Sequence, residues 1–105
     1  MEMIAEKTVE IARKLAPAET ADASVCQILI NEIRRRLNRY DLTDRQFRRK
    51  YGMTFQEFCE RDVVQEKGYS WEVESDFCDW EMAITGLESL KSSLNELERG
   101  IGVGR

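Results

Sequence analysis

The amino-acid sequence predicts an all-α protein, a bundle of four or five helices that ends in a long C-terminal helix. Apolar residues recur every three or four positions along most of the chain, and no segment alternates between apolar and polar residues long enough to indicate a strand. Charged residues make up 34% of the chain, which is typical of long helices with solvated faces. The chain has one proline, and three of its six glycines fall at its C-terminal end, so the interior contains few helix breakers.

The chain is expected to form one helical domain, residues 1–105, with a peripheral helix in residues 1–16 and a flexible tail at residues 100–105. The first helix has a thin apolar stripe, which consists of Ile4, Thr8, Ile11 and Leu15. Pro17 then either breaks the helical pattern or opens the next helix as its first residue.

The second helix is expected to begin at Ser24, because residues 24–27 have the pattern of a capping box. In such a box the serine hydroxyl and the Gln27 amide satisfy backbone N–H groups that have no partner inside the helix. The side chains of this helix that face the core are expected to be Cys26, Ile30, Ile33, Leu37 and Tyr40.

Two shorter helices are expected next. The first would start at a possible capping box in residues 43–46 and end at Gly52. The second would start at the clearest capping box of the chain, residues 54–57, and end at Gly68. A hydrophobic staple would flank this box, formed by Met53 and Phe58.

The last helix is expected to be the longest, capped by Ser70 and running to about Arg99. Its apolar stripe spans four heptads and is made of Val73, Phe77, Trp80, Ala83, Ile84, Leu87, Leu90, Leu94 and Leu97. Asp76 also falls on this stripe, and a buried carboxylate there would need a partner such as an arginine. Gly86 is expected to weaken the helix by about 1 kcal/mol relative to alanine.

The composition excludes several classes of site. The chain has no histidine, so Ser-His-Asp, Cys-His and two-histidine metal sites are ruled out. Its three cysteines are widely spaced and form no CxxC pair, which indicates reduced thiols in a cytoplasmic protein. No apolar run approaches the roughly 20 residues of a membrane span. We therefore expect no catalytic residues, no cofactor and no membrane partner.

Basic residues concentrate between Ile33 and Tyr51, although the whole chain has a net charge of −4. The block consists of Arg34, Arg35, Arg36, Arg39, Arg45, Arg48, Arg49 and Lys50. One interpretation is a face that binds nucleic-acid phosphates. The favoured interpretation is a solvated surface that pairs with the acidic last helix, of the same chain or of a second copy.

Two carboxylate pairs have the spacing of a magnesium site. They are Glu57 with Glu60, and Asp76 with Asp79. Residues three apart lie on one helix face, so two such pairs on adjacent helices could hold Mg²⁺, as in all-α nucleotide pyrophosphohydrolases. The fuller signature of those enzymes is absent, and charged helices produce such pairs by chance. Surface charge is the favoured interpretation.

Trp71 and Trp80 are nine residues apart in the last helix. Trp80 lies on the apolar stripe and is expected to anchor the core. Trp71 lies off the stripe, where a core does not need it, and tryptophan is enriched at interface hot spots. The sequence thus predicts a partner-binding surface on the last helix, formed by Trp71, Glu72, Asp79, Glu81 and Glu88.

Three motifs resemble a known family. They are YGMTFQEF at residues 51–58, SWEVESDF at residues 70–77 and DWE at residues 79–81. The pattern is similar to that of small helical proteins encoded beside toxin genes, the TumA-type antitoxins, over roughly residues 30–98. Gln56 and Cys59 stand where the family pattern has acids.

The resemblance implies the antitoxin half of a toxin–antitoxin pair, which is not an enzyme and neutralises its toxin by direct contact. The partner would be a small toxin encoded nearby. A nucleic-acid-binding regulator acting through residues 34–50 and a Mg²⁺-dependent nucleotide hydrolase are the alternatives. A homodimer through the last helix is also expected, because its stripe is longer than the other helices that the sequence predicts.

Overall fold

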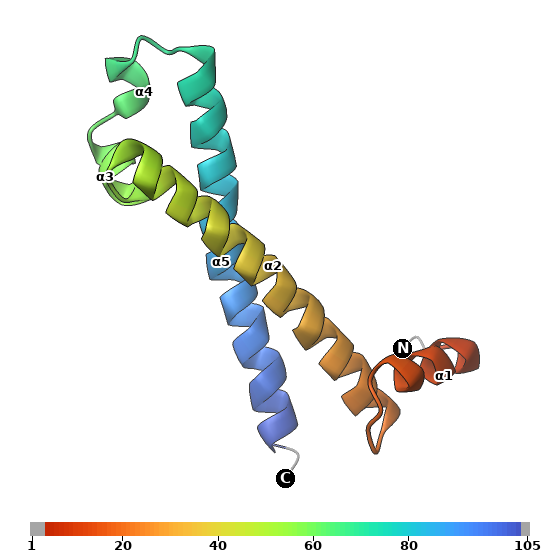
Figure 1. Ribbon diagram of the computed structural model, residues 1–105. Coiled ribbons are helices and arrows are strands. Elements are labelled where there is room, and N and C mark those ends of the chain that lie inside the picture. The colour runs from red at the N-terminus through yellow and green to blue at the C-terminus, as the bar shows by residue number, and fades with distance from the viewer. Residues whose placement is uncertain (1–3, 104–105) are drawn as a thin grey trace. The chain divides into compact units, whose positions relative to one another are not determined.

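The computed structural model describes the backbone of residues 4–103 and the side chains of residues 4–100. All secondary structure in the described residues is helical, which confirms the predicted all-α class with a long C-terminal helix. Figure 1 shows the five helices, which are α1 (Glu6–Leu15), α2 (Ala21–Tyr51), α3 (Phe55–Glu60), α4 (Val63–Glu66) and α5 (Trp71–Val103).

The second helix differs from the prediction at its start. α2 begins at Ala21, and its cap is Thr20, whose hydroxyl accepts a hydrogen bond from the backbone N–H of Ala23 at 3.0 Å. Ser24 lies one turn further on, fully buried, and its hydroxyl has no hydrogen-bond partner among the described residues. The predicted capping box at residues 24–27 is therefore wrong.

α2 is also continuous where a break was expected. Thr43 lies inside the helix, and its hydroxyl donates a hydrogen bond to the carbonyl of Arg39 at 3.2 Å. Two ion pairs across one helical turn support the helix here, Asp41 with Arg45 at 2.9 Å and Asp44 with Arg48 at 3.2 Å. The predicted separate helix starting at residues 43–46 is wrong because these side chains pair along the helix.

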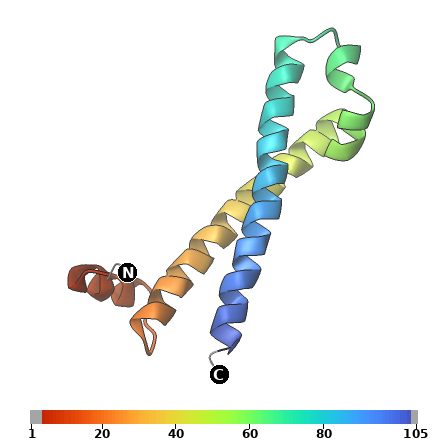
Figure 2. The ribbon, with the colours of Figure 1, turned by 180° about the vertical axis from the view of Figure 1, so that it is seen from behind.

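The predicted turn signals after α2 are confirmed. Gly52 ends α2 with φ +68°, a conformation that glycine adopts without steric cost. Thr54 and Glu57 form a complete capping box at the start of α3. The helix then breaks earlier than expected, because Asp62 has φ +50° and separates α3 from α4 before Gly68 is reached. Figure 2 shows both short helices between the end of α2 and the start of α5.

α1 buries only small side chains. Its buried residues are Ala12 and, just after the helix, Ala16. Ile11 and Leu15 are 49% and 70% exposed. The thin apolar stripe of this helix is therefore exposed, and Pro17 lies in the connection to α2 rather than in a helix.

The contacts divide the chain into two compact units. One comprises the described residues up to Arg35 and from Ser92 onward, and the other is Arg36–Lys91. In the first unit the buried side chains are those of Ala12, Ala16, Ser24 and Ile30. An ion pair joins Arg34 to Glu98 at 2.8 Å in the same unit. The prediction of one domain stays a prediction.

The second unit contains an aromatic core. Trp80 is fully buried, and four rings surround it with centroids 5.2–5.9 Å from its own, those of Phe47, Tyr51, Phe55 and Phe58. Phe77 stacks on the rings of Phe55 and Phe58. Most of the hydrophobic stabilisation of this unit comes from these rings, because large aromatic side chains bury the most surface.

α2 and α5 run antiparallel within residues 36–91. Asp44 lies against Trp80, while Lys50, further along α2, lies against Asp76, which is earlier in α5. At Gly86 the helices approach so closely that an added Cβ would lie 2.5 Å from the ring of Tyr40. The glycine expected to weaken α5 thus provides the space for this aromatic ring.

The apolar stripe of α5 is covered within the chain. Val73, Trp80 and Ala83 are buried, and Leu87 and Leu90 are half-buried. α2 is longer than predicted and covers this part of the stripe, and the expected homodimer stays a prediction. The expected flexible tail is helical as far as Val103, and residues 104–105 lie outside the described residues.

Candidate protein-binding surface

The two tryptophans point in opposite directions from α5. Nine residues at about 100° each bring Trp80 half a turn away from Trp71. Trp71 is accordingly 82% exposed, whereas Trp80 is 0% exposed. The burial matches the sequence-based division into an outward tryptophan and a core tryptophan.

Trp71 starts an exposed strip along α5 that we call the outer face. It consists of Trp71, Glu74, Cys78, Glu81, Met82 and Thr85, all of which are exposed. Met82 is 66% exposed and repeats the apolar character of Trp71 three turns later. Lysine and arginine are missing from residues 71–90, whereas Arg36 and Arg39 of α2 line hollows together with residues of the outer face.

The predicted acidic partner residues do not share one face. Glu72 forms an ion pair with Lys50 at 3.0 Å. Asp79 lines a hollow together with Arg39 and Gln46 of α2. Glu81 belongs to the outer face, and Glu88 lies beside α3, where it lines a hollow with Gln56 and Glu60 among others. Of the predicted acids, Glu81 accompanies Trp71 on the outer face, and Glu88 lies seven residues further along nearly the same side of α5.

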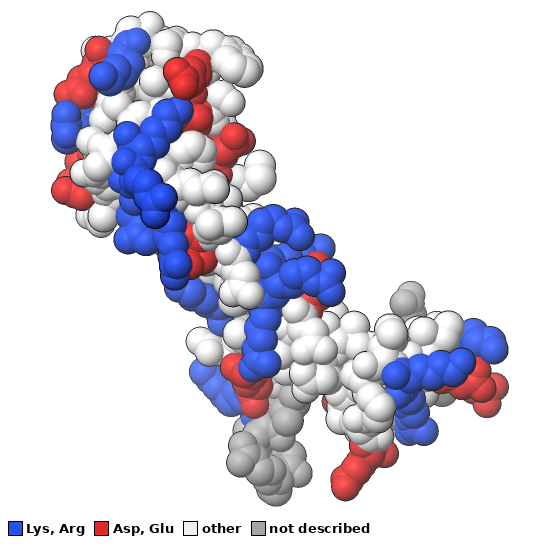
Figure 3. Space-filling model, in the orientation of Figure 1, with Lys and Arg blue, Asp and Glu red and all other residues white. Residues whose placement is uncertain are grey.

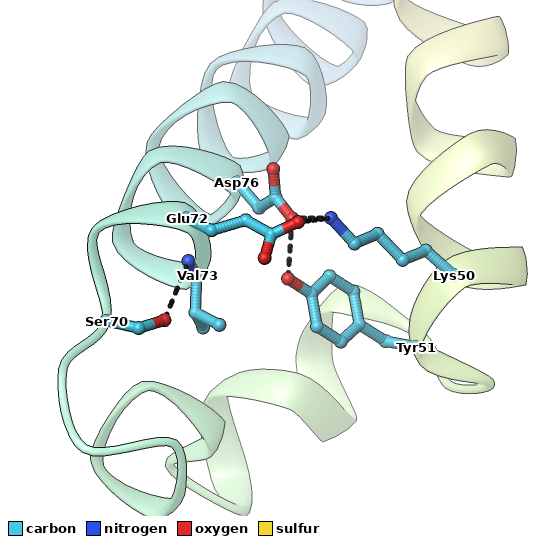
Figure 4. A network of polar contacts seen from close by, with 6 residues as sticks. All are labelled: Lys50, Tyr51, Ser70, Glu72, Val73 and Asp76. Atoms are coloured by element: carbon cyan, nitrogen blue, oxygen red, sulfur yellow. Dashed lines mark hydrogen bonds and ion pairs between the residues drawn. The ribbon is translucent and has the colours of Figure 1, made fainter.

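Asp76 has the partner that the sequence required, although the partner is not an arginine. Figure 4 shows its carboxylate accepting hydrogen bonds from the Lys50 ammonium and the Tyr51 hydroxyl, each at 2.6 Å. Lys50 also reaches Glu72. This arrangement compensates the partial burial of the Asp76 side chain, which is 15% exposed.

The pKa values of this network reflect its geometry. Partial burial of Asp76 would raise its pKa, but the hydrogen bonds from Lys50 and Tyr51 outweigh burial and hold the pKa below its ordinary value. Burial, assisted by the hydrogen bond to Asp76, raises the pKa of Tyr51 to about 12. Hydrogen bonds to Asp76 and Glu72 raise the pKa of Lys50. At neutral pH the network consists of an ionised carboxylate, an ammonium and a neutral phenol, and it links α2 to α5.

One polar contact of the core was not foreseen. The indole N–H of Trp80 donates a hydrogen bond to the Asp44 carboxylate at 2.9 Å, and Arg48 pairs with the same carboxylate. The contact satisfies the only polar atom of a fully buried tryptophan. No local sequence pattern indicates it, because the two residues are 36 positions apart.

The basic block lies along α2, and Figure 3 shows several of its side chains on the face in view. Arg34 and Lys50 pair with α5, as the favoured interpretation requires. Arg35, Arg45 and Arg48 instead pair with acids of α2 itself, at 2.9–3.3 Å. Arg39 and Arg49 have no carboxylate partner among the described residues.

The four carboxylates of the alternative magnesium site are not brought together. Glu57 accepts hydrogen bonds in the capping box of α3, and hydrogen bonding to Thr54 lowers its pKa. Glu60 accepts a hydrogen bond from Gln56, and Asp76 binds Lys50 and Tyr51. Within the described part of the chain, no three carboxylates or thiols form a group that could hold a metal ion.

A groove of about 510 Å³ lies between α5 and the two short helices. Its walls include Phe58, Val63, Val64, Tyr69 and Phe77, and its charged residues are Asp62 and Glu74. We call it the α3–α5 groove. Cys59 and Cys78 also line it, both as free thiols, and burial raises the pKa of Cys59. The sequence did not predict this groove, because its walls come from three helices whose packing has no local signature.

Comparison of the chain with protein families, curated proteins and solved structures finds no match. Among the described helices, none combines the length and apolar composition needed to cross a membrane.

Proposed function

We propose that this chain is a protein-binding module, the antitoxin half of a toxin–antitoxin pair, which neutralises its toxin by direct contact through the outer face of α5. The observation that carries the proposal is the 82% exposure of Trp71. A large aromatic side chain in water costs free energy that a partner recovers by covering it. The family resemblance of residues 51–81 supports the antitoxin role.

The charge of α5 supports a basic partner. From Trp71 to Leu90 the helix carries six acids and no base. A toxin that acts on RNA or nucleotides is basic around its active site, and an acidic helix speeds association with such a surface. Electrostatic attraction supplies the rate of encounter, while the desolvated Trp71 supplies affinity.

The test is co-expression with the product of the neighbouring gene, followed by pull-down and titration calorimetry. Trp71→Ala should weaken the complex by roughly 2 kcal/mol or more and leave the helical circular dichroism unchanged. The matched control is Leu42→Ala, an exposed apolar residue of α2 that is 56% accessible, which should bind like the parent protein. Full affinity of the Trp71→Ala protein for a genuine partner would contradict the proposal.

A second candidate is nucleic-acid binding through α2. The observation in its favour is that Arg39 and Arg49 lack carboxylate partners among the described residues, while their neighbours are paired. Because most of the block is already neutralised by acids, we expect weak binding that falls steeply with salt. Nanomolar affinity for duplex DNA or RNA at about 150 mM salt would make this the leading function.

A further inference from the structure

α1 carries an exposed apolar face with positive charge beside it. Ile11 and Leu15 lie one turn apart and are 49% and 70% exposed. Lys7 and Lys14 flank them on the same side, four residues before and three residues after Ile11. Lys7 has only an exposed ion pair with Glu10 at 3.3 Å, and Lys14 has no carboxylate partner among the described residues. Contacts within the unit that contains α1 do not cover this face, so its apolar side chains are exposed to water.

The α3–α5 groove has the opposite character. Its walls are mainly apolar, and the two charges at its edge, Asp62 and Glu74, are both negative and exposed. Lysine and arginine are absent from its lining. A branched aliphatic side chain with a lysine next to it therefore matches the apolar lining and the negative charge of the groove.

We propose that α1 of a second copy of this chain docks in the α3–α5 groove, with Ile11 and Leu15 entering it and the lysines of α1 facing Asp62 and Glu74. Two copies exchange their α1 helices reciprocally, so that each supplies one helix and one groove. This arrangement closes with two-fold symmetry, whereas a one-way contact would continue into a filament. It also doubles the apolar area that the pair removes from water, which a stable interface requires.

The proposed dimer is formed by the chain alone, although Glu74 and Cys78 belong both to the α3–α5 groove and to the outer face. Both contacting surfaces belong to this chain, so purified protein is sufficient to test the dimer. Other occupants of the same surfaces give different results. Pairing of α1 with α1 would leave the groove unused, and docking of α1 in a groove of the same chain would give a monomer.

The experiment is sedimentation equilibrium of the full chain over micromolar concentrations. The parent protein should have about twice the 12.3 kDa mass of one chain. Leu15→Asp in α1 and Glu74→Lys at the groove should each weaken association by about tenfold or more. Leu29→Asp and Glu96→Lys are matched controls, since both residues are exposed and lie outside the two surfaces, and they should associate like the parent.

Two combinations identify the contact itself. Lys14→Glu combined with Glu74→Lys in one chain should recover much of the association that either change removes, because the charge pair is restored with opposite sign. An equimolar mixture of Leu15→Asp and Glu74→Lys chains leaves one intact helix and one intact groove between two chains, so heterodimers held by that single contact should form beside the weakened homodimers. Circular dichroism of every variant should equal that of the parent.

Each other outcome overturns the proposal. If the parent protein is monomeric at every concentration measured, the α1 helices are not exchanged between copies. Loss of association with Leu15→Asp but not with Glu74→Lys indicates contact of α1 with α1. Loss with Glu74→Lys alone indicates that a different element occupies the groove. Failure of the Lys14→Glu, Glu74→Lys combination to recover association would exclude the proposed contact.

Discussion

Gly86 and Tyr40 illustrate how one side chain sets the separation of two helices. The Tyr40 ring occupies the space in which a Cβ on residue 86 would lie, at 2.5–2.9 Å from three ring atoms. Alanine at this position gains about 1 kcal/mol in helix propensity, but overpacking costs about 1–3 kcal/mol. The balance between these two effects decides the sign of a substitution.

We predict that Gly86→Ala lowers the free energy of unfolding by about 1 kcal/mol, because a half-buried aromatic ring has little room to move. Urea denaturation measures the change. Gly100→Ala is the matched control, since nothing lies within 4 Å of its added Cβ, and it should be neutral or slightly stabilising. In a Tyr40→Ala background Gly86→Ala should become stabilising, and a destabilising effect there would show that Tyr40 is not the obstacle.

Asp76 gives the protein a predictable response to acid. Its pKa is lower in the folded protein than its ordinary value of 3.8, so its ionised form stabilises the fold above that pH. The contribution is lost as the pH falls through the folded pKa. Tyr51 acts at the other end of the pH range, because its pKa rises from 10.0 to about 12, so its contribution is complete below pH 10.0 and is lost as the pH rises towards 12.

We predict that Asp76→Asn lowers the free energy of unfolding at neutral pH by about 1–3 kcal/mol, because two hydrogen bonds to a charged acceptor are weakened. Urea midpoints between about pH 7 and pH 3 should fall less for this variant than for the parent protein. Asp79→Asn, at an exposed neighbouring position, should follow the parent profile. Parallel acid limbs for Asp76→Asn and the parent would contradict the assignment.

At the scale of the element, two hydroxyl side chains near the start of α2, those of Thr20 and Ser24, have opposite effects on stability. Thr20 caps the helix, while Ser24 places an unpaired hydroxyl in a fully buried position. A cap satisfies a backbone donor that the helix leaves free, whereas a buried hydroxyl without a partner loses its hydrogen bond to water. The two residues are therefore expected to respond differently to the same substitution.

We predict that Thr20→Ala destabilises the protein by about 1 kcal/mol, whereas Ser24→Ala is neutral or stabilising. Thermal unfolding followed by circular dichroism compares the two variants directly. The comparison is internally controlled, because each change removes one hydroxyl near the same end of α2. A larger loss from Ser24→Ala than from Thr20→Ala would show that the buried hydroxyl has a hydrogen-bond partner in solution.

The positions of the short helices α3 and α4 are set by their packing against the core and by the turn between them. Each has too few residues to be stable by itself. Phe58 and Val63, 1% and 2% exposed, hold them against the aromatic core. The residues between them, including Asp62 in a left-handed conformation, turn the chain so that both side chains face that core. The shape of the α3–α5 groove follows from this turn.

At the scale of the whole molecule, the two units differ in what they bury. The unit of residues 36–91 contains the ring contacts of Trp80 with four other aromatic side chains. The other unit buries Ala12, Ala16, Ser24 and Ile30, of which Ile30 alone is a large apolar residue. Local stability follows the amount of buried apolar surface, so the units should open at different free energies.

We predict that amide hydrogen exchange is slower in α2 after Arg36 and in α5 before Lys91 than in the parts of the same helices that belong to the other unit. Exchange followed by NMR or mass spectrometry at neutral pH resolves the two segments of each helix. Ile30→Ala should speed exchange in the smaller unit and leave residues 36–91 protected. Equal protection along the full length of α2 would show that the chain opens as one cooperative unit.

The sequence by itself determined the helical class, the long last helix, and the local signals that depend on neighbouring residues. Gly52 as a stop, the Thr54 capping box and the Ser70 cap, whose hydroxyl accepts from the Val73 N–H at 3.3 Å, are all confirmed. The opposite directions of Trp71 and Trp80 were also predictable, because a regular helix turns by a constant angle per residue.

Only the tertiary structure decided where α2 begins, that it continues to Tyr51, and which surfaces remain uncovered. Trp80 lies 36 positions from Asp44, and Lys50 and Tyr51 lie 26 and 25 positions from Asp76. No local pattern encodes contacts over such distances. The α3–α5 groove and the exposed face of α1 are surfaces that the packing of the helices leaves uncovered. A periodic pattern shows that a helix has an apolar face, but the element that covers this face is chosen by the competition among all the faces of the folded chain.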